Sequence, residues 1–157
     1  MPRESWAIRG KVGLLAHEPM LYRALSVREN LHHQARLLGV PSERADRLIE
    51  RVGVAARADE PLRTLSRGTV QRAAAARAVL ADPPLLLLDE PYANLDPGGA
   101  AMVAPLLEEN RSVLISGHEP RMLLERSDVA LGLRGGRRAF LKPSTDVSDS
   151  DIKALYG

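Results

Sequence analysis

The chain has 157 residues, of which 45% are hydrophobic and 27% are charged, as expected for one soluble globular domain. Its net charge of only +2 and its aromatic content of 3% argue against a strongly basic or base-stacking surface, so no nucleic-acid partner is expected. The absence of cysteine excludes disulfides and cysteine-ligated zinc, and no segment has the apolar length of a membrane span or the core of a signal peptide.

The first half of the chain has the pattern of one strand followed by helices. A strand is predicted over 11–16, ending at His17. Ser26 and Glu29 have the spacing of a capping box and predict a helix over 27–38. Further helices are expected over 41–53 and 66–81, separated by a charged, irregular stretch over 55–63.

Strands and helices alternate in the second half. The run Leu85–Leu88 predicts a buried strand, and the pair Gly135-Gly136 predicts a hairpin with strands over 129–133 and 138–141. The other expected elements are a helix over 98–110, a strand over 112–116, a helix over 120–126, a polar linker over 142–149 and a short helix around Ile152 and Leu155. This order predicts a parallel α/β core that carries a helical insertion.

An acidic pair directly follows the leucine strand. Asp89 and Glu90 would stand at the C-terminal end of a buried parallel strand, which is the sheet edge where ligands bind in open α/β folds. Two carboxylates there can hold a divalent metal and activate a water for nucleotide hydrolysis. Taken alone, the pair is explained equally well by a buried strand that ends in a solvated acidic turn.

Other polar residues also stand at the ends of predicted elements. Ser66 and Gly68 open a long helix, where free backbone N–H groups suit a phosphate, although a simple cap is the more common role of such a serine. His118 follows a strand and could sense a terminal phosphate, although a lone histidine there is more often structural. His32 and His33 fit a solvated helix face better than a metal site.

Taken together, these motifs resemble the ATP-binding subunit of an ATP-binding cassette (ABC) protein over roughly 11–141. Leu65–Arg72 (LSRGTVQR) is similar to the family's signature motif, Leu85–Glu90 (LLLLDE) to its Walker B motif, and Ala93–Asp96 (ANLD) to its D-loop. The resemblance implies an α/β, P-loop NTPase-like core with an inserted α-helical subdomain, and Mg²⁺ and ATP as cofactors. The implied parts are a partial α/β catalytic core over 1–17 and 76–141, a helical subdomain with the signature motif over 18–75, and a linker with a C-terminal helix over 142–157.

The resemblance also implies roles for single residues. Glu90 would be catalytic, orienting or deprotonating the attacking water, and His118 would be catalytic through its contact with the γ-phosphate and that water. Asp89 would hold Mg²⁺ through water. Ser66 and Gly68 would bind the γ-phosphate of a nucleotide held by an opposite subunit. The remaining nucleotide-binding residues would be Asp96 and His17.

The family's Walker A motif, G-x-x-x-x-G-K-[ST], does not occur in this sequence. The one Gly-Lys pair, Gly10-Lys11, is followed by Val12. The chain is therefore expected to start after the P-loop, to bind ATP weakly and to hydrolyse it negligibly on its own. Because the P-loop strand is expected to neighbour the Walker B strand, Leu85–Leu88 is expected to have an unpaired edge.

Three substitutions further distinguish the chain from the usual family pattern. His17 stands where the family usually has glutamine, and the surrounding sequence is similar to the haem-exporter branch involved in cytochrome c maturation. In the signature, Arg67 replaces a common small residue and Thr69 replaces the usual glutamine. Thr69 keeps a hydrogen-bonding group, so we expect tuning of the signature rather than its loss.

The leading hypothesis is an ATP-binding and ATP-hydrolysing subunit that powers an ABC transporter, present here in truncated form. It would act as a homo- or heterodimer of nucleotide-binding domains, with a membrane-spanning partner docked near His17, and would lie in the cytoplasm at the inner face of the cell membrane. One alternative is a degenerate, non-catalytic fragment with a binding or regulatory role, against which the acidic pair and His118 argue. The other is an ABC-type ATPase not linked to transport, which would carry coiled-coil insertions or a linker to a second cassette.

Overall fold

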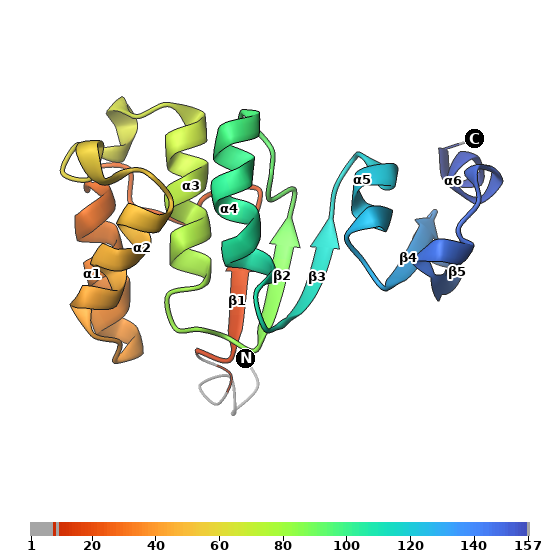
Figure 1. The fold of residues 1–157 in the computed structure, drawn as a ribbon, viewed down its shortest axis with the longest axis horizontal. Coiled ribbons are helices and arrows are strands. Elements are labelled where there is room, and N and C mark those ends of the chain that lie inside the picture. The colour runs from red at the N-terminus through yellow and green to blue at the C-terminus, as the bar shows by residue number, and fades with distance from the viewer. Residues whose placement is uncertain (1–7, 9, 157) are drawn as a thin grey trace. The chain divides into compact units, whose positions relative to one another are not determined.

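The computed structural model describes residue 8 and residues 10–156. The chain forms two compact units, unit 1 up to Ile115 and unit 2 from Ser116 onward. In chain order the elements are β1 (Val12–Leu15), α1 (Val27–Leu38), α2 (Ser42–Arg51), α3 (Arg67–Ala78), β2 (Leu85–Asp89), α4 (Pro97–Glu108), β3 (Ser112–Ser116), α5 (Pro120–Glu125), β4 (Val129–Arg134), β5 (Arg137–Pro143) and α6 (Asp149–Tyr156) (Figure 1). None of the described helices is long and apolar enough to cross a membrane.

The first helix of unit 1 is confirmed at both ends. The Ser26 hydroxyl accepts from the Glu29 N–H (3.1 Å), and the Glu29 carboxylate accepts from the Ser26 N–H (2.7 Å), which completes the predicted capping box. α1 ends at Gly39, whose φ of 67° lies in the left-handed region that glycine adopts without cost. The third helix ends at Ala78, earlier than predicted, and the chain turns through Asp82 (φ 52°) ahead of two prolines.

A buried asparagine organises the loop that leads into α1. Asn30 is 3% exposed, and its amide N–H₂ donates to the carbonyls of Tyr22 (3.0 Å) and Ser26 (2.8 Å). Its Oδ1 accepts from the Tyr22 N–H (2.7 Å). Asparagine is a poor helix former, so its place in a helix interior is explained by these contacts. They fix the path of the chain between the end of β1 and the helices.

The strands of unit 1 form one sheet in the order β1-β2-β3. β1 and β2 pair in parallel with Leu15 opposite Leu88, and the arrows of β2 and β3 run the same way (Figure 1). The expectation of an unpaired edge at Leu85–Leu88 is therefore wrong, because β2 is the central strand and both of its edges are occupied. Among the described strands the open edge belongs to β3, which pairs on one side only.

Helices pack closely against one face of this sheet. Leu15, Leu86 and Leu88 are at most 3% exposed and belong to the same core as the alanines of α3. A Cβ on Gly13 would overlap the Ala78 carbonyl oxygen, so α3 approaches β1 as closely as a glycine allows. Arg77 adds a hydrogen bond from Nη2 to the Leu14 carbonyl (2.6 Å), and burial lowers the pKa of its guanidinium.

Unit 2 is built on a hairpin. β4 and β5 pair antiparallel with Leu131 opposite Leu141, and the connecting pair Gly135-Gly136 has positive φ at both positions, as a tight hairpin turn requires. The predicted polar linker over 142–149 is instead largely structured, because β5 runs to Pro143 and α6 begins at Asp149. Lys142 pairs with Asp151 of α6 (2.7 Å), and this contact is the main reason why the pKa of that carboxyl is lowered.

Candidate functional site

The parallel pairing of β1 and β2 brings two predicted site residues together. Because Leu15 and Leu88 are paired, the residues that follow both strands emerge at the same edge of the sheet. His17 Nδ1 lies 4.0 Å from Glu90 Oε2, with side-chain exposures of 74% and 26% respectively. Asp89, the last residue of β2, is exposed beside them. The acidic pair therefore lies at the carboxyl edge of the sheet, open to solvent, as the sequence predicts.

A tight turn follows β2 and fixes the direction of Glu90. The backbone of Glu90 has φ 50° and that of Asn94 has φ 63°, both in the left-handed region that residues other than glycine rarely adopt. The turn is closed by a hydrogen bond from the Ala93 N–H to the Glu90 carbonyl (3.1 Å). Strained backbone of this kind concentrates at functional sites, because surrounding structure must hold it in place.

The signature-like and D-loop-like segments meet within this chain. A Cβ on Gly68 would stand 3.0 Å from the Asn94 carbonyl oxygen, so the start of α3 lies against the turn after β2. Ser66 caps α3 by accepting from the Thr69 N–H (3.2 Å), and Asp96 caps α4 by accepting from the Gly99 N–H (2.8 Å). Figure 1 shows both helices beginning at the end of the sheet where β2 ends. Both predicted nucleotide-binding residues thus have a structural role as well.

The sequence analysis did not identify Gln71, which supports the turn after β2 through hydrogen bonds. Gln71 of α3 is 7% exposed, and its Nε2 donates to the carbonyl of Pro91 (3.1 Å) and, at 3.5 Å, to that of Glu90. The signal was available, because an amide that interrupts the apolar side of an alanine-rich helix requires a buried acceptor. Arg72 plays a similar part on the other side of α3, donating to the carbonyls of Val52 and Gly53 (2.9 Å each).

Replacement of Gln71 is expected to loosen the acidic turn. Gln71→Met keeps the volume but removes the donor, leaving the Pro91 carbonyl without it, and should cost about 1–2 kcal/mol in the free energy of unfolding. Gln71→Glu places a carboxylate against carbonyl oxygens and should cost more. Urea unfolding gives these values, and amide exchange over 90–96 should accelerate in both variants. Equal stability of Gln71→Met and the parent chain would contradict the supporting role.

The donors at this edge suit Mg²⁺. Asp89 and Glu90 offer carboxylate oxygens, and Mg²⁺ is commonly held by one or two carboxylates, retained waters and the phosphates of the substrate. Among the described residues no group of three or more histidine or acidic side chains forms a cage for a metal. An edge with few protein ligands fits a metal that arrives with a nucleotide better than a resident structural ion.

His118 lies in unit 2, and its predicted contact with the γ-phosphate and the attacking water stays a prediction. Within unit 2 it lines a hollow of about 560 Å³ together with residues of α5 and α6, among them Arg121 and Lys153. The lining also includes the acidic residues Glu119 and Asp149, and Arg121 pairs with Asp149 (3.2 Å). His118 and Glu90 are both held by contacts of their own.

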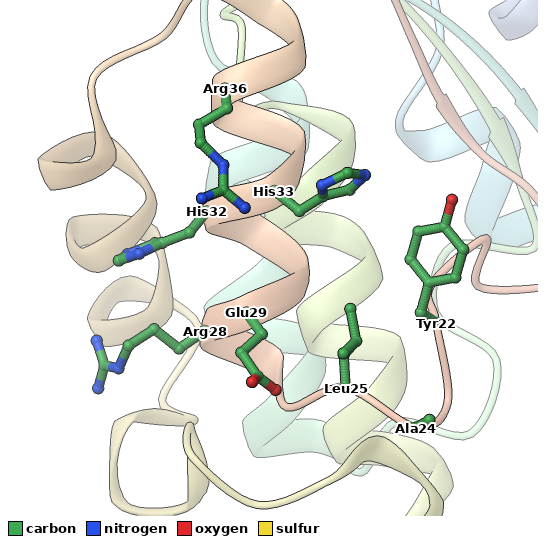
Figure 2. A pocket seen from close by; sticks show the side chains of 8 residues that line it. All are labelled: Tyr22, Ala24, Leu25, Arg28, Glu29, His32, His33 and Arg36. Carbon is green, nitrogen blue, oxygen red and sulfur yellow. The ribbon is translucent and has the colours of Figure 1, made fainter.

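A second hollow, of about 690 Å³, runs along the exposed side of α1. Figure 2 shows its basic side chains, Arg28, His32, His33 and Arg36, facing outward from the helix beside Tyr22. His32 does not stand on a purely solvated face, because its Nε2 lies 3.0 Å from Asp46 Oδ1. His32, and after it Arg28, lower the pKa of the Asp46 carboxyl. The ring of His33 meets that of Tyr22 edge-on at 5.8 Å.

Comparison with known proteins decides the family. A family model described as "ABC transporter" matches residues 2–93, more than half of the chain. The chain belongs to the ABC transporter family. This ABC chain is 36% identical to the phosphonates import ATP-binding protein PhnC of Frankia casuarinae, over 94% of the chain and 65% of that protein. It is 39% identical to the phosphate-import ATP-binding protein PhnC of Mycolicibacterium smegmatis, over 69% of the chain and 43% of that protein.

A solved structure agrees with this assignment at the level of the fold. CbiO1 from Clostridium perfringens, described as part of the ABC transporter complex cbiONQ, superimposes with a TM-score of 0.76 at 24% identity, over 97% of the ABC chain and 65% of its own. The predicted P-loop NTPase-like α/β fold is therefore confirmed. The ABC chain spans roughly two fifths to two thirds of the length of these relatives. The similarity to the haem-exporter branch stays a prediction.

Proposed function

We propose that this ABC chain is the ATP-hydrolysing part of the energy-coupling subunit of a transporter, with its catalytic carboxylates at the carboxyl edge of the sheet. The observation that carries the proposal is the convergence of Glu90, Asp89 and His17 at the ends of two paired parallel strands. The relatives at 36–39% identity are named as import proteins, which supports import as the direction of transport. A nucleic-acid-linked ATPase is disfavoured by the net charge of only +2 and the aromatic content of 3%.

Each predicted residue has a part in this function. Glu90 orients or deprotonates the attacking water, and its carboxylate lies at the sheet edge, 4.0 Å from His17 Nδ1. Asp89 would hold Mg²⁺ through water, and the ion would supply charge neutralisation to the phosphates. His17 shares the edge with Glu90 and contacts the metal-bound nucleotide. His118 would contact the γ-phosphate and the attacking water.

This chain has no P-loop motif with which to position a phosphate. No G-x-x-x-x-G-K-[ST] occurs in the 157 residues, so the cradle of N–H groups and the lysine that hold the β- and γ-phosphates have no counterpart here. We therefore infer that these residues by themselves bind ATP weakly and turn it over negligibly. The catalytic carboxylates would serve a phosphate that another segment positions.

The chain acts with partners in this proposal. A second nucleotide-binding domain supplies the nucleotide that Ser66 and Gly68 contact, since both stand at the start of α3 with N–H groups available to a phosphate. A membrane-spanning subunit docks beside His17 on the hollow along α1, where basic side chains line an open surface next to the loop that follows β1 (Figure 2). This places the protein at the cytoplasmic face of the membrane.

The proposed role of the signature is tested by measuring ATP binding to a complete cassette in the presence of this chain. Full-length PhnC of Frankia casuarinae is titrated with a fluorescent ATP analogue, with and without the ABC chain. If the signature of the chain reaches a nucleotide held by the partner, its addition should tighten binding about fivefold or more, as coupled sites do. Ser66→Ala should remove this gain, because it removes the hydroxyl at the start of α3.

A matched variant separates this role from helix capping. Ser26→Ala removes the cap of α1, so both substitutions should cost about 1 kcal/mol of stability. Only Ser66→Ala should change nucleotide affinity. Equal effects of the two variants, or no effect of the ABC chain on the affinity of the cassette, would overturn the proposed signature role.

A further inference from the structure

The acidic turn that follows β2 is attached to α4 by a side chain. The hydroxyl of Tyr92, which stands shortly after Glu90, donates to Oε1 of Glu108 at 2.6 Å. Glu108 is the last residue of α4, the helix into which the turn leads. A hydroxyl that donates to a carboxylate over so short a distance forms a charge-assisted hydrogen bond, which is stronger than a neutral one. Tyr92 therefore connects the turn to the far end of the helix.

The place of Tyr92 in the backbone makes this connection relevant to Glu90. The Ala93 N–H donates to the Glu90 carbonyl (3.1 Å), and the Leu95 N–H donates to the Tyr92 carbonyl (3.2 Å), so two tight turns overlap at Tyr92. Glu90, with φ 50°, begins the first turn, and Asn94, with φ 63°, stands inside the second. Backbone of this kind persists only where neighbouring structure holds it. A residue that both turns share is well placed to hold both.

Gln71 by itself does not fix the direction of the turn. It holds the turn from α3 at the Pro91 carbonyl (3.1 Å), and Pro91 is fully buried. A segment attached at one point can still rotate about that point, whereas a second attachment on another helix fixes its orientation. Tyr92 supplies the second attachment, on α4. Orientation matters for Glu90, because a group that acts on a water must be held to within about 0.5 Å of its productive position.

The sequence places Glu108 where the helix itself disfavours an acid. The last turn of α4 has no basic residue, and the C-terminal end of a helix repels a carboxylate. The tyrosine hydroxyl gives the carboxylate of Glu108 a donor at this unfavourable position. We propose that Tyr92, held by Glu108, is a positioning residue for the carboxylate of Glu90. The proposal rests on the water-activating role proposed above for Glu90.

Amide exchange in the chain without nucleotide tests the attachment. Tyr92→Phe removes the hydroxyl and keeps the ring, so exchange over 93–96 should accelerate about threefold or more, while exchange in α1 should stay unchanged. Glu108→Leu removes the acceptor and should have the same effect. The double variant should exchange no faster than either single variant, because all three lack the same hydrogen bond.

Two variants provide matched controls. Glu108→Gln keeps a carbonyl oxygen that can accept from the tyrosine hydroxyl, so it should restore exchange to within about twofold of the parent chain. Tyr156→Phe removes the same atom from a tyrosine that is 69% exposed in unit 2, and it should behave as the parent chain does. Circular dichroism establishes that each variant is folded. If Tyr92→Phe were unfolded, Glu108→Leu would decide the outcome.

The direction of the Glu90 side chain is followed separately, by NMR. His17 Nδ1 lies 4.0 Å from Glu90 Oε2, so a nuclear Overhauser effect between the imidazole and the Glu90 methylenes is expected in the parent chain. It should weaken about threefold or more in Tyr92→Phe and persist in Glu108→Gln and Tyr156→Phe. A hydroxyl that only stabilised the fold would leave this signal unchanged.

Activity connects the position of Glu90 with the reaction. When the P-loop segment of Frankia casuarinae PhnC precedes the chain, Tyr92→Phe should lower kcat about fivefold and leave KM within about twofold. Unchanged exchange in both Tyr92→Phe and Glu108→Leu, or faster exchange with an unchanged Overhauser effect, would overturn the positioning role. Those measurements require no ATP. An inactive parent chimera would instead contradict the proposed function, and the position that Tyr92 gives to the Glu90 side chain would still be decided by NMR.

Discussion

Gly13→Ala is expected to lower the free energy of unfolding of unit 1 by about 3 kcal/mol or more, although it adds a single methyl group. The new Cβ would overlap both the Ala78 carbonyl oxygen and the Leu86 side chain, and would lie 2.9 Å from Pro83 Cγ. A backbone carbonyl at a helix end cannot move aside as a flexible side chain can. Relief therefore requires α3 to withdraw from β1, which would open the core that positions the acidic turn.

A second glycine provides the control for this experiment. Gly98→Ala, in the first turn of α4, adds the same methyl group where nothing lies within 4 Å and the φ is ordinary. It should be neutral or should stabilise by about 0.5–1 kcal/mol, since alanine restricts the unfolded chain. Urea unfolding of the three proteins measures both changes. Similar stability of Gly13→Ala and Gly98→Ala would show that the approach of α3 to β1 is not tight.

Local signals were sufficient for most of the elements. The capping box at Ser26, the leucine strand and the Gly135-Gly136 turn are each marked by a pattern within a few consecutive residues, and the structure has all of them. The segment 142–149 was predicted to be a polar linker, because the contacts that order it come from residues distant in the sequence. The Ser144 N–H donates to the Asp128 carbonyl, and Lys142 reaches α6, neither of which composition reveals.

The candidate site likewise has features that local sequence patterns predict and features that only the fold reveals. The acidic pair at the end of a buried strand was predictable, and so were the starts of α3 and α4. Strand order was not, because hydrophobicity shows that Leu85–Leu88 is buried without showing which strands flank it. The amide of Gln71 within an alanine run indicates a buried acceptor, but the sequence does not identify that acceptor as Pro91, which only the fold brings to it.

The largest change in activity is expected from supplying the P-loop and then removing Glu90. A chimera in which the P-loop segment of Frankia casuarinae PhnC precedes this chain should hydrolyse MgATP, whereas the chain alone should not rise above the uncatalysed background. In the chimera Glu90→Gln should lower kcat at least 100-fold, because the amide keeps the shape but cannot accept a proton from the water. ATP affinity should persist, since the role proposed for Glu90 is to act on water rather than on the nucleotide.

Glu109→Gln is the matched control, because this carboxylate is exposed at the end of α4 and pairs with Arg51 (3.4 Å), away from the acidic turn. It should leave kcat within about twofold of the chimera, as surface substitutions usually do. Phosphate release and equilibrium ATP binding are measured on the chimera, on its Glu90→Gln and Glu109→Gln variants, and on the chain alone with and without Glu90→Gln. If the chain alone hydrolysed ATP and lost that activity in Glu90→Gln, the P-loop would be dispensable. If Glu90→Gln and Glu109→Gln behaved alike in the chimera, the turn after β2 would hold its carboxylate for some purpose other than water activation.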